Sequence, residues 1–66
     1  MKLCYKIDVV EALKQKGYNT NRIRLNKLLS ESTMTKLRHG EGVGWENLET
    51  LCNLLECQPC DILEMR

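Results

Sequence analysis

Cys57 and Cys60 form the most recognisable chemical spacing in this chain of 66 residues, a Cys-x-x-Cys pair. Two cysteines at this spacing can form a redox pair or supply half of a zinc site. A zinc site with four ligands would need two more, from Cys4, Cys52 or His39, and the chain has neither a second such pair nor histidines at metal-binding spacing. We therefore expect no metal and no cofactor, and interpret Cys52, Cys57 and Cys60 first as small apolar residues around the last two helices.

Groups for catalysis are scarce. His39 is the single histidine, and it has neither an adjacent nucleophile nor a paired carboxylate. The chain also lacks a glycine-rich loop that could cradle phosphate groups. We predict that the protein is not an enzyme, and nothing implies a small-molecule ligand.

A second set of polar side chains lies on one short amphipathic segment, residues 30–39. Met34 and Leu37 are three residues apart and predict the buried face of a helix. The outward positions are Glu31, Ser32, Thr35, Lys36 and Arg38. Lys can donate to guanine, Glu can accept from cytosine, and Ser or Thr can serve either base, on a helix that would fit a major groove. Any amphipathic surface helix has this pattern, so the neighbouring elements must decide.

Charge is segregated along the chain, although the net charge is only +1. Residues 14–40 carry seven bases and one acid, a net charge of +6, and the remainder carries −5. The bases of this segment are Lys14, Lys16, Arg22, Arg24, Lys27, Lys36 and Arg38. Such an asymmetry can steer a polyanion toward one face, whereas the alternative is chance clustering of solvated side chains.

Turn residues divide the chain into five short segments with helical spacing, and no repeat, linker, βαβ alternation or hairpin signal is present. The expected N-caps are Asp8, one of Asn19, Thr20 and Asn21, then Ser30, Asn47 and Gln58, the last followed by Pro59. Gly17 and Gly40 are expected to end the first and third helices. We therefore predict an all-α fold, a compact five-helix bundle in a single domain over residues 1–66, with residues 1–6 extended.

The fourth segment carries the strongest apolar stripe and is expected to form the centre of the core. Its members are Leu48, Leu51, Cys52, Leu54 and Leu55. The fifth helix is expected to carry Ile62, Leu63 and Met65. Trp45, just before the fourth helix, is either a lid over the core or part of an exposed patch, and we favour the lid.

Residues 17–40, GYNTNRIRLNKLLSESTMTKLRHG, resemble the helix-turn-helix of the phage repressor and Cro type, also called the XRE family. Ile23, Met34 and Leu37 fall at the buried positions of that motif, Ser30 at the cap of its recognition helix, and the closing KLRHG is similar to KLRNG. Residues 48–63, LETLCNLLECQPCDIL, resemble the fourth and fifth helices of the same lambda-repressor-like fold.

The resemblance implies which residues contact DNA. Glu31, Ser32 and Lys36 would face base edges, with Thr33 and Thr35 at the margin of the groove. Asn19, Thr20 and His39 would lie against phosphates. Charge and position, rather than the resemblance, add Arg22, Lys27 and Arg38 to the phosphate contacts.

Three features depart from the family pattern. Arg24 stands where the family usually has a small residue, so its stem should extend outward to solvent. Leu28 stands where the family usually places the glycine of the turn, and a left-handed residue there costs about 1 kcal/mol unless the turn is altered or the second helix is longer. The loop EGVGWEN after the third helix has two acids and no base.

These features together predict a sequence-specific regulator of transcription, bacterial or phage, that binds double-stranded DNA. Useful specificity implies a homodimer on a two-fold symmetric site, and the residues around Ile62, Leu63 and Met65 are the expected contact. No apolar run could span a bilayer and the start resembles no signal peptide, so we expect a cytoplasmic protein with no membrane partner. A protein-interaction adaptor or antitoxin-like module on the same fold, and a thiol switch, remain the alternatives.

Overall fold

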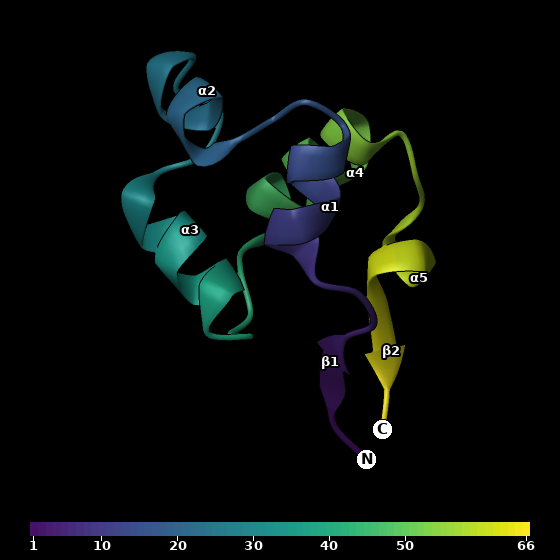
Figure 1. The fold of residues 1–66 in the computed structure, drawn as a ribbon. Helices are drawn as coiled ribbons and strands as arrows, with labels where there is room; N and C mark the ends of the chain where they lie inside the picture. The colour runs from purple at the N-terminus through teal and green to yellow at the C-terminus, as the bar shows by residue number, and fades with distance from the viewer.

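The computed structural model describes residues 1–66 and contains five helices and two short strands (Figure 1). Their bounds are β1 (Leu3–Tyr5), α1 (Val9–Gln15), α2 (Thr20–Leu25), α3 (Glu31–Arg38), α4 (Trp45–Leu55), α5 (Pro59–Ile62) and β2 (Leu63–Met65). The number and order of the five helices confirm the prediction. The all-α class has to be amended, because the strands pair into a small sheet.

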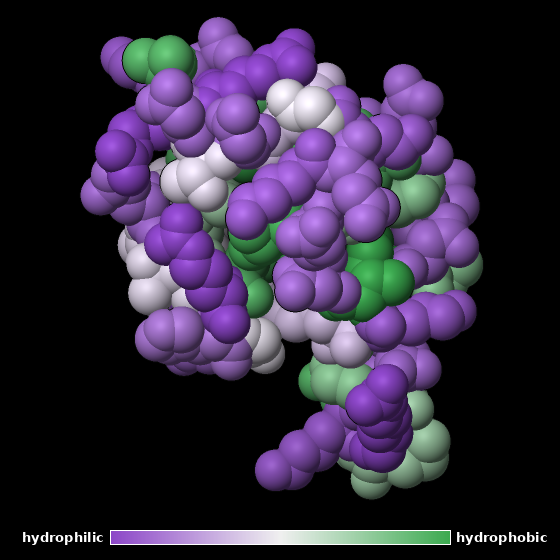
Figure 2. Space-filling view, in the orientation of Figure 1, coloured by the Kyte–Doolittle hydropathy of each residue, from purple (hydrophilic) through white to green (hydrophobic).

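The two strands form an antiparallel ribbon that projects from the helical body and carries both termini (Figures 1 and 2). Leu3 lies opposite Met65 and Tyr5 opposite Leu63. The expectation that Leu63 and Met65 lie on the fifth helix was wrong. The Lys6 amide donates to the Ile62 carbonyl at 2.7 Å, so the chain leaves the helix there and continues paired to β1.

Three helices begin at N-caps that the sequence predicts. Asp8, Asn19 and Ser30 each accept a hydrogen bond from the amide three residues later, at 3.1, 2.8 and 3.2 Å. Gln58 precedes Pro59 at the start of α5, as expected. The prediction of Asn47 as a cap was wrong, because the cap of α4 is Gly44, three residues earlier.

The turn after α2 is closed by a left-handed residue, but that residue is Lys27 (φ 52°) and not Leu28. The Lys27 amide donates to the Arg24 carbonyl at 3.2 Å, and the Leu28 amide donates to the Ile23 carbonyl at 3.1 Å. These two bonds form a Schellman motif. The expectation about Leu28 is therefore corrected by one position, and the strain of the turn falls on Lys27.

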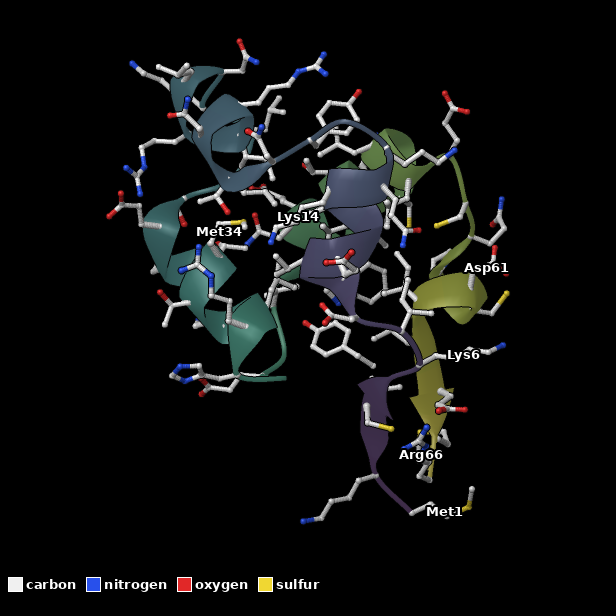
Figure 3. The ribbon with its side chains drawn as sticks, in the orientation of Figure 1. Met1, Lys6, Lys14, Met34, Asp61 and Arg66 are labelled. Carbon is white, nitrogen blue, oxygen red and sulfur yellow. The ribbon has the colours of Figure 1, made fainter.

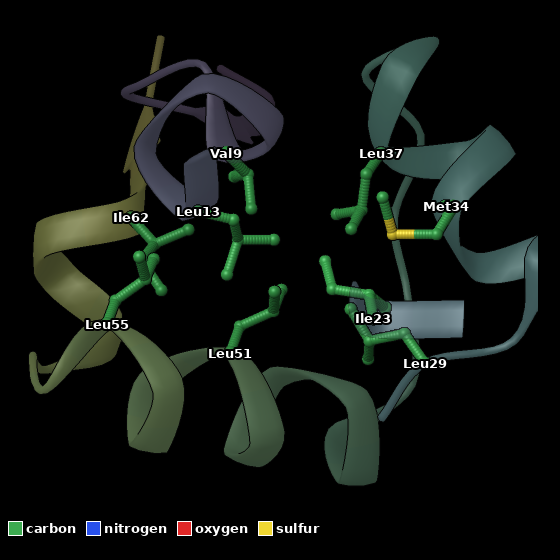
Figure 4. Packing of buried hydrophobic residues seen from close by; sticks show 9 residues of the cluster. All are labelled: Val9, Leu13, Ile23, Leu29, Met34, Leu37, Leu51, Leu55 and Ile62. Carbon is green, nitrogen blue, oxygen red and sulfur yellow. The ribbon is translucent and has the colours of Figure 1, made fainter. Parts of the chain in front are cut away.

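Nine apolar side chains from all five helices and the turn after α2 form one core (Figure 4). They are Val9, Leu13, Ile23, Leu29, Met34, Leu37, Leu51, Leu55 and Ile62. Trp45 is not a lid, since 91% of it is exposed. At 100° per residue, Trp45 lies about 80 to 120° around α4 from Leu51 and Leu55, outside the buried stripe.

Candidate nucleic-acid interface

Helices α2 and α3 are both anchored to the hydrophobic core by buried side chains. Ile23 of α2, Leu29 of the turn, and Met34 and Leu37 of α3 are buried together (Figure 4). The prediction that Met34 and Leu37 form the buried face of this helix is therefore confirmed. The polar side chains of α3 other than Thr33 are exposed, and this buried face holds them in place.

A buried hydroxyl group on α3 also connects this helix to α4 by a hydrogen bond. Thr33 is only 5% exposed, and its Oγ1 lies 2.9 Å from the Ser30 hydroxyl and accepts a hydrogen bond from Asn47 Nδ2 at 3.2 Å. The prediction that Thr33 lies at the margin of a groove is thus corrected, because its side chain is inside the molecule. Asn47 is a positioning residue that the sequence analysis missed, and its nearness to Thr33 depends on the folding of the whole chain.

The remaining predicted base contacts lie on the exposed part of α3. They are Glu31, Ser32, Thr35 and Lys36. The Thr35 hydroxyl donates to the Glu31 carbonyl at 3.0 Å, and the Ser32 hydroxyl lies 3.1 Å from that of Ser30. Lys36 forms no ion pair, so its ammonium group is available to a ligand.

A shallow hollow of about 100 Å³ separates α2 from α3, and two arginines line it. Arg24 Nε lies 3.1 Å from Glu31 Oε1, and Arg38 Nη2 donates to Thr20 Oγ1 at 3.5 Å. Arg24 is exposed, so the prediction that its stem extends outward is confirmed. The exposed Arg24–Glu31 ion pair is worth about 0 to 1 kcal/mol, and the hydrogen bond of Arg38 to Thr20 is long, so each guanidinium could exchange its present partner for a phosphate at little cost.

The other predicted phosphate contacts are more dispersed. Arg22 folds back toward the segment that precedes α2, where Nη1 donates to the Gly17 carbonyl at 3.0 Å and the guanidinium lies 4.6 Å from the centre of the Tyr18 ring. The Asn19 side-chain oxygen is engaged as the cap of α2. Lys27 and His39 are exposed, and His39 Nδ1 lies 3.8 Å from Glu41 Oε2. Thr20 and Arg38 are thus the two predicted phosphate contacts that the fold brings together.

The cysteines lie away from this surface, around α4 and α5 and on β1. Cys52 and Cys57 are half-buried, in agreement with their interpretation as small apolar residues around the last two helices, whereas Cys60 is exposed. Burial, followed by the neighbouring Cys52 and Asp61, raises the pKa of the Cys57 thiol and so lowers its thiolate fraction. No three histidine, cysteine or acidic side chains are grouped so that they could hold a metal ion.

The chain was compared with known proteins. A family model described as Cro/C1-type HTH DNA-binding domain matches residues 9–66. A search of curated proteins gave no match, and neither did a search of solved structures. No helix of the structure has both the length and the apolar character that crossing a membrane requires.

Proposed function

The chain belongs to the Cro/C1-type helix-turn-helix DNA-binding domain family, and on this basis we propose that it is a sequence-specific regulator of transcription. It acts in a bacterial or phage system in the cytoplasm, as a homodimer on double-stranded DNA. Helix α3 enters the major groove, and occupancy of a promoter blocks or recruits polymerase.

The exposed polar face of α3 is the observation that carries this proposal. Met34 and Leu37 bury the opposite face, and the Asn47–Thr33 hydrogen bond holds the helix to α4. A reading helix must be rigid in this way, because bidentate contacts with base edges tolerate little displacement. We assign the base contacts to Glu31, Ser32, Thr35 and Lys36.

Backbone contacts flank this helix in the proposal. The side chains lining the hollow between α2 and α3, namely Thr20, Arg24 and Arg38, lie beside the reading face. Lys27 and His39 extend this polar surface, and Asn19 and Arg22 contribute if their present hydrogen bonds are exchanged. Phosphate contacts supply sequence-independent affinity, so this group sets the strength of binding and the α3 residues set the selectivity.

Anisotropy of a labelled duplex across a salt series tests the proposal. Each neutralised phosphate contributes about −0.9 to the slope of log affinity against log salt, and we expect a slope of about −4 to −6 between roughly 50 and 200 mM. Absence of binding at the lowest salt would contradict the proposed function.

An adaptor or antitoxin-like role is the second candidate, and one observation favours it. Trp45 is exposed at the edge of a wide hollow that Leu48, Cys52 and Pro59 also line. Exposed aromatic residues beside an apolar surface are typical of protein contacts. Trp45→Ala would abolish capture of a protein partner in this case, and it should leave DNA affinity unchanged if the first proposal holds.

A further inference from the structure

The ribbon of β1 and β2 has an unpaired edge that fits a second copy of itself. Lys2 and Arg66 exchange both of their backbone hydrogen bonds, at 2.6 and 2.9 Å, and the Lys6 amide donates to Ile62. Hydrogen-bonded and non-hydrogen-bonded pairs alternate along an antiparallel ladder, so Leu3 and Tyr5, between these positions, direct their amides and carbonyls away from β2. A free strand edge of this kind is a template for another strand.

The opposite edge of the ribbon is less available. Leu63 and Met65 occupy the outward positions of β2. Leu63 is also the C-cap of α5, and its amide already donates to the Pro59 carbonyl. Only Met65 offers a free amide there. The outer edge of β1 is therefore the better template.

One face of the ribbon is apolar, and it is uncovered at its outer end, at Leu3 and Met65, whereas Tyr5 and Leu63 are half-buried against the core. Side chains of directly opposed residues lie on the same face, which places Leu3, Tyr5, Leu63 and Met65 together. Leu3 is 64% exposed, Met65 is 53% exposed, and Met1 beyond them is 92% exposed. A two-stranded ribbon is marginal by itself in water, whereas a sheet of more strands that shares an apolar face is stable.

We infer that two copies of this chain associate through antiparallel pairing of β1 with β1, which forms a four-stranded sheet around a two-fold axis at Leu3. This inference deepens the proposed function, because it assigns the contact of the proposed homodimer. Of the contact residues expected from the sequence, Ile62 is fully buried and cannot meet a partner, whereas Leu63 and Met65 lie on the ribbon beside β1.

Charge selects the register of this pairing. With Leu3 opposite the partner's Leu3, Met1 lies opposite the partner's Tyr5 and Lys2 opposite the partner's Cys4. Cys4 is small and lies opposite Glu64 in the ribbon. Arg66 occupies Oε2 of the Glu64 carboxylate at 2.7 Å, which leaves Oε1 for the Lys2 ammonium of the other copy to reach across Cys4. A shift of two residues in either direction would instead oppose Lys2 to the partner's Lys2 or to the partner's Lys6, and directly opposed like charges are destabilising.

Two proline variants of the full chain test the interface by sedimentation equilibrium without DNA. The wild type should be a dimer. Leu3→Pro removes an amide that makes no bond within the ribbon, and an edge strand tolerates proline at such a position. Two symmetric donors are lost, so we expect the dimer dissociation constant to rise by about tenfold or more, with unchanged helical circular dichroism.

Met65→Pro is the matched control, since it removes the outward amide on the other edge of the same ribbon. It should associate as the wild type does. A monomeric wild type at millimolar concentration, or loss of the dimer in Met65→Pro alone, would overturn the inference.

A cross-link tests the register independently of proline. Lys2→Cys, treated with a thiol oxidant that accepts the two electrons, should give a dimer joined through Cys4, and Cys4→Ser in the same chain should prevent it. A wild-type dimer joined through its two Cys4 residues would instead indicate the shifted register and contradict ours. These readouts need no DNA, so an intact dimer that binds no duplex would refute the proposed function alone. DNA binding by a wild-type monomer would refute the interface and the homodimeric form of the regulator, and would leave DNA binding itself intact.

Discussion

Asn47 Nδ2 donates to Thr33 Oγ1 at 3.2 Å, which ties the first turns of α4 to the first turn of α3. Thr33 also lies 2.9 Å from the Ser30 hydroxyl, so the capping residue of α3 belongs to the same network. The orientation of the exposed helix face is therefore set by a polar contact between elements as well as by the core.

Asn47→Ala should lower the free energy of unfolding by about 1 kcal/mol, because the Thr33 hydroxyl loses one of its partners inside the protein. DNA affinity should fall as well, because α3 loses a restraint. Asn53→Ala is the control, since Asn53 is exposed on the same helix and should change stability by less than about 0.5 kcal/mol. Denaturant unfolding measures both variants, and equal stabilities would show that the bond contributes nothing.

Lys36→Ala should cost about 1 to 3 kcal/mol on the preferred duplex and relax selectivity at about one base position. Arg38→Ala should weaken binding to every duplex alike and reduce the magnitude of the salt slope by about 1, because Arg38 is assigned to a phosphate. Lys14→Ala, exposed on α1, serves as the charge-matched control. Uniform loss in the Lys36 variant across a set of duplexes would remove its role as a reader of bases.

Lys27→Gly and Glu56→Gly should each raise the free energy of unfolding by about 0.5 to 1 kcal/mol. Both residues have positive φ, 52° and 53°. Glycine removes the strain energy of this conformation in the folded protein, and this gain exceeds the loss of stability that comes from the greater conformational entropy of glycine in the unfolded chain. Glu49→Gly, in the middle of α4, should instead lower stability by about 1 kcal/mol. Thermal unfolding distinguishes the signs, and destabilisation by both of the first two changes would contradict the assigned turn geometry.

The Cys57 thiol should react more slowly than the exposed Cys60 thiol near pH 8, because burial raises the pKa of Cys57 and less of it is thiolate. The same raised pKa has a consequence for stability. As the pH rises, the Cys57 thiol loses its proton in the unfolded chain before it does so in the folded protein. The contribution of Cys57 to the free energy of unfolding is therefore fully present below about pH 8.5 and decreases above it. Alkylation followed by mass spectrometry measures the two rates, and faster labelling of Cys57 would return the thiol switch to consideration.

Local features of this fold could be predicted from the sequence, because their partners are close along the chain. Asp8, Asn19 and Ser30 each bond an amide three residues away, and apolar spacing alone places Met34 and Leu37 inside. The exposure of the candidate site residues could be predicted for the same reason. Four of the five proposed base contacts lie on the exposed face of α3, and the buried Thr33 is the exception.

Features that depend on distant partners could not be predicted. The Asn47 amide reaches a hydroxyl 14 residues away, which no capping rule anticipates. The strand pairing joins Leu3 to Met65 across the whole domain, and three-residue strands carry almost no periodicity. The Trp45 prediction was wrong for another reason. Trp45 was expected in the loop before the fourth helix, but it is the first residue of α4, where it lies outside the buried stripe.

The paired ends of the chain also bear on the order of folding. Lys2 and Arg66 exchange backbone hydrogen bonds, and Figure 3 shows Arg66 and Met1 at the same end of the ribbon. This pairing closes the longest loop in the protein and should form late. A short linker from Arg66 to Met1 would turn the ribbon into a local hairpin. The chain could then be opened in the loop between α3 and α4 to give a circular permutant with lower contact order, which should fold faster than the natural connectivity does.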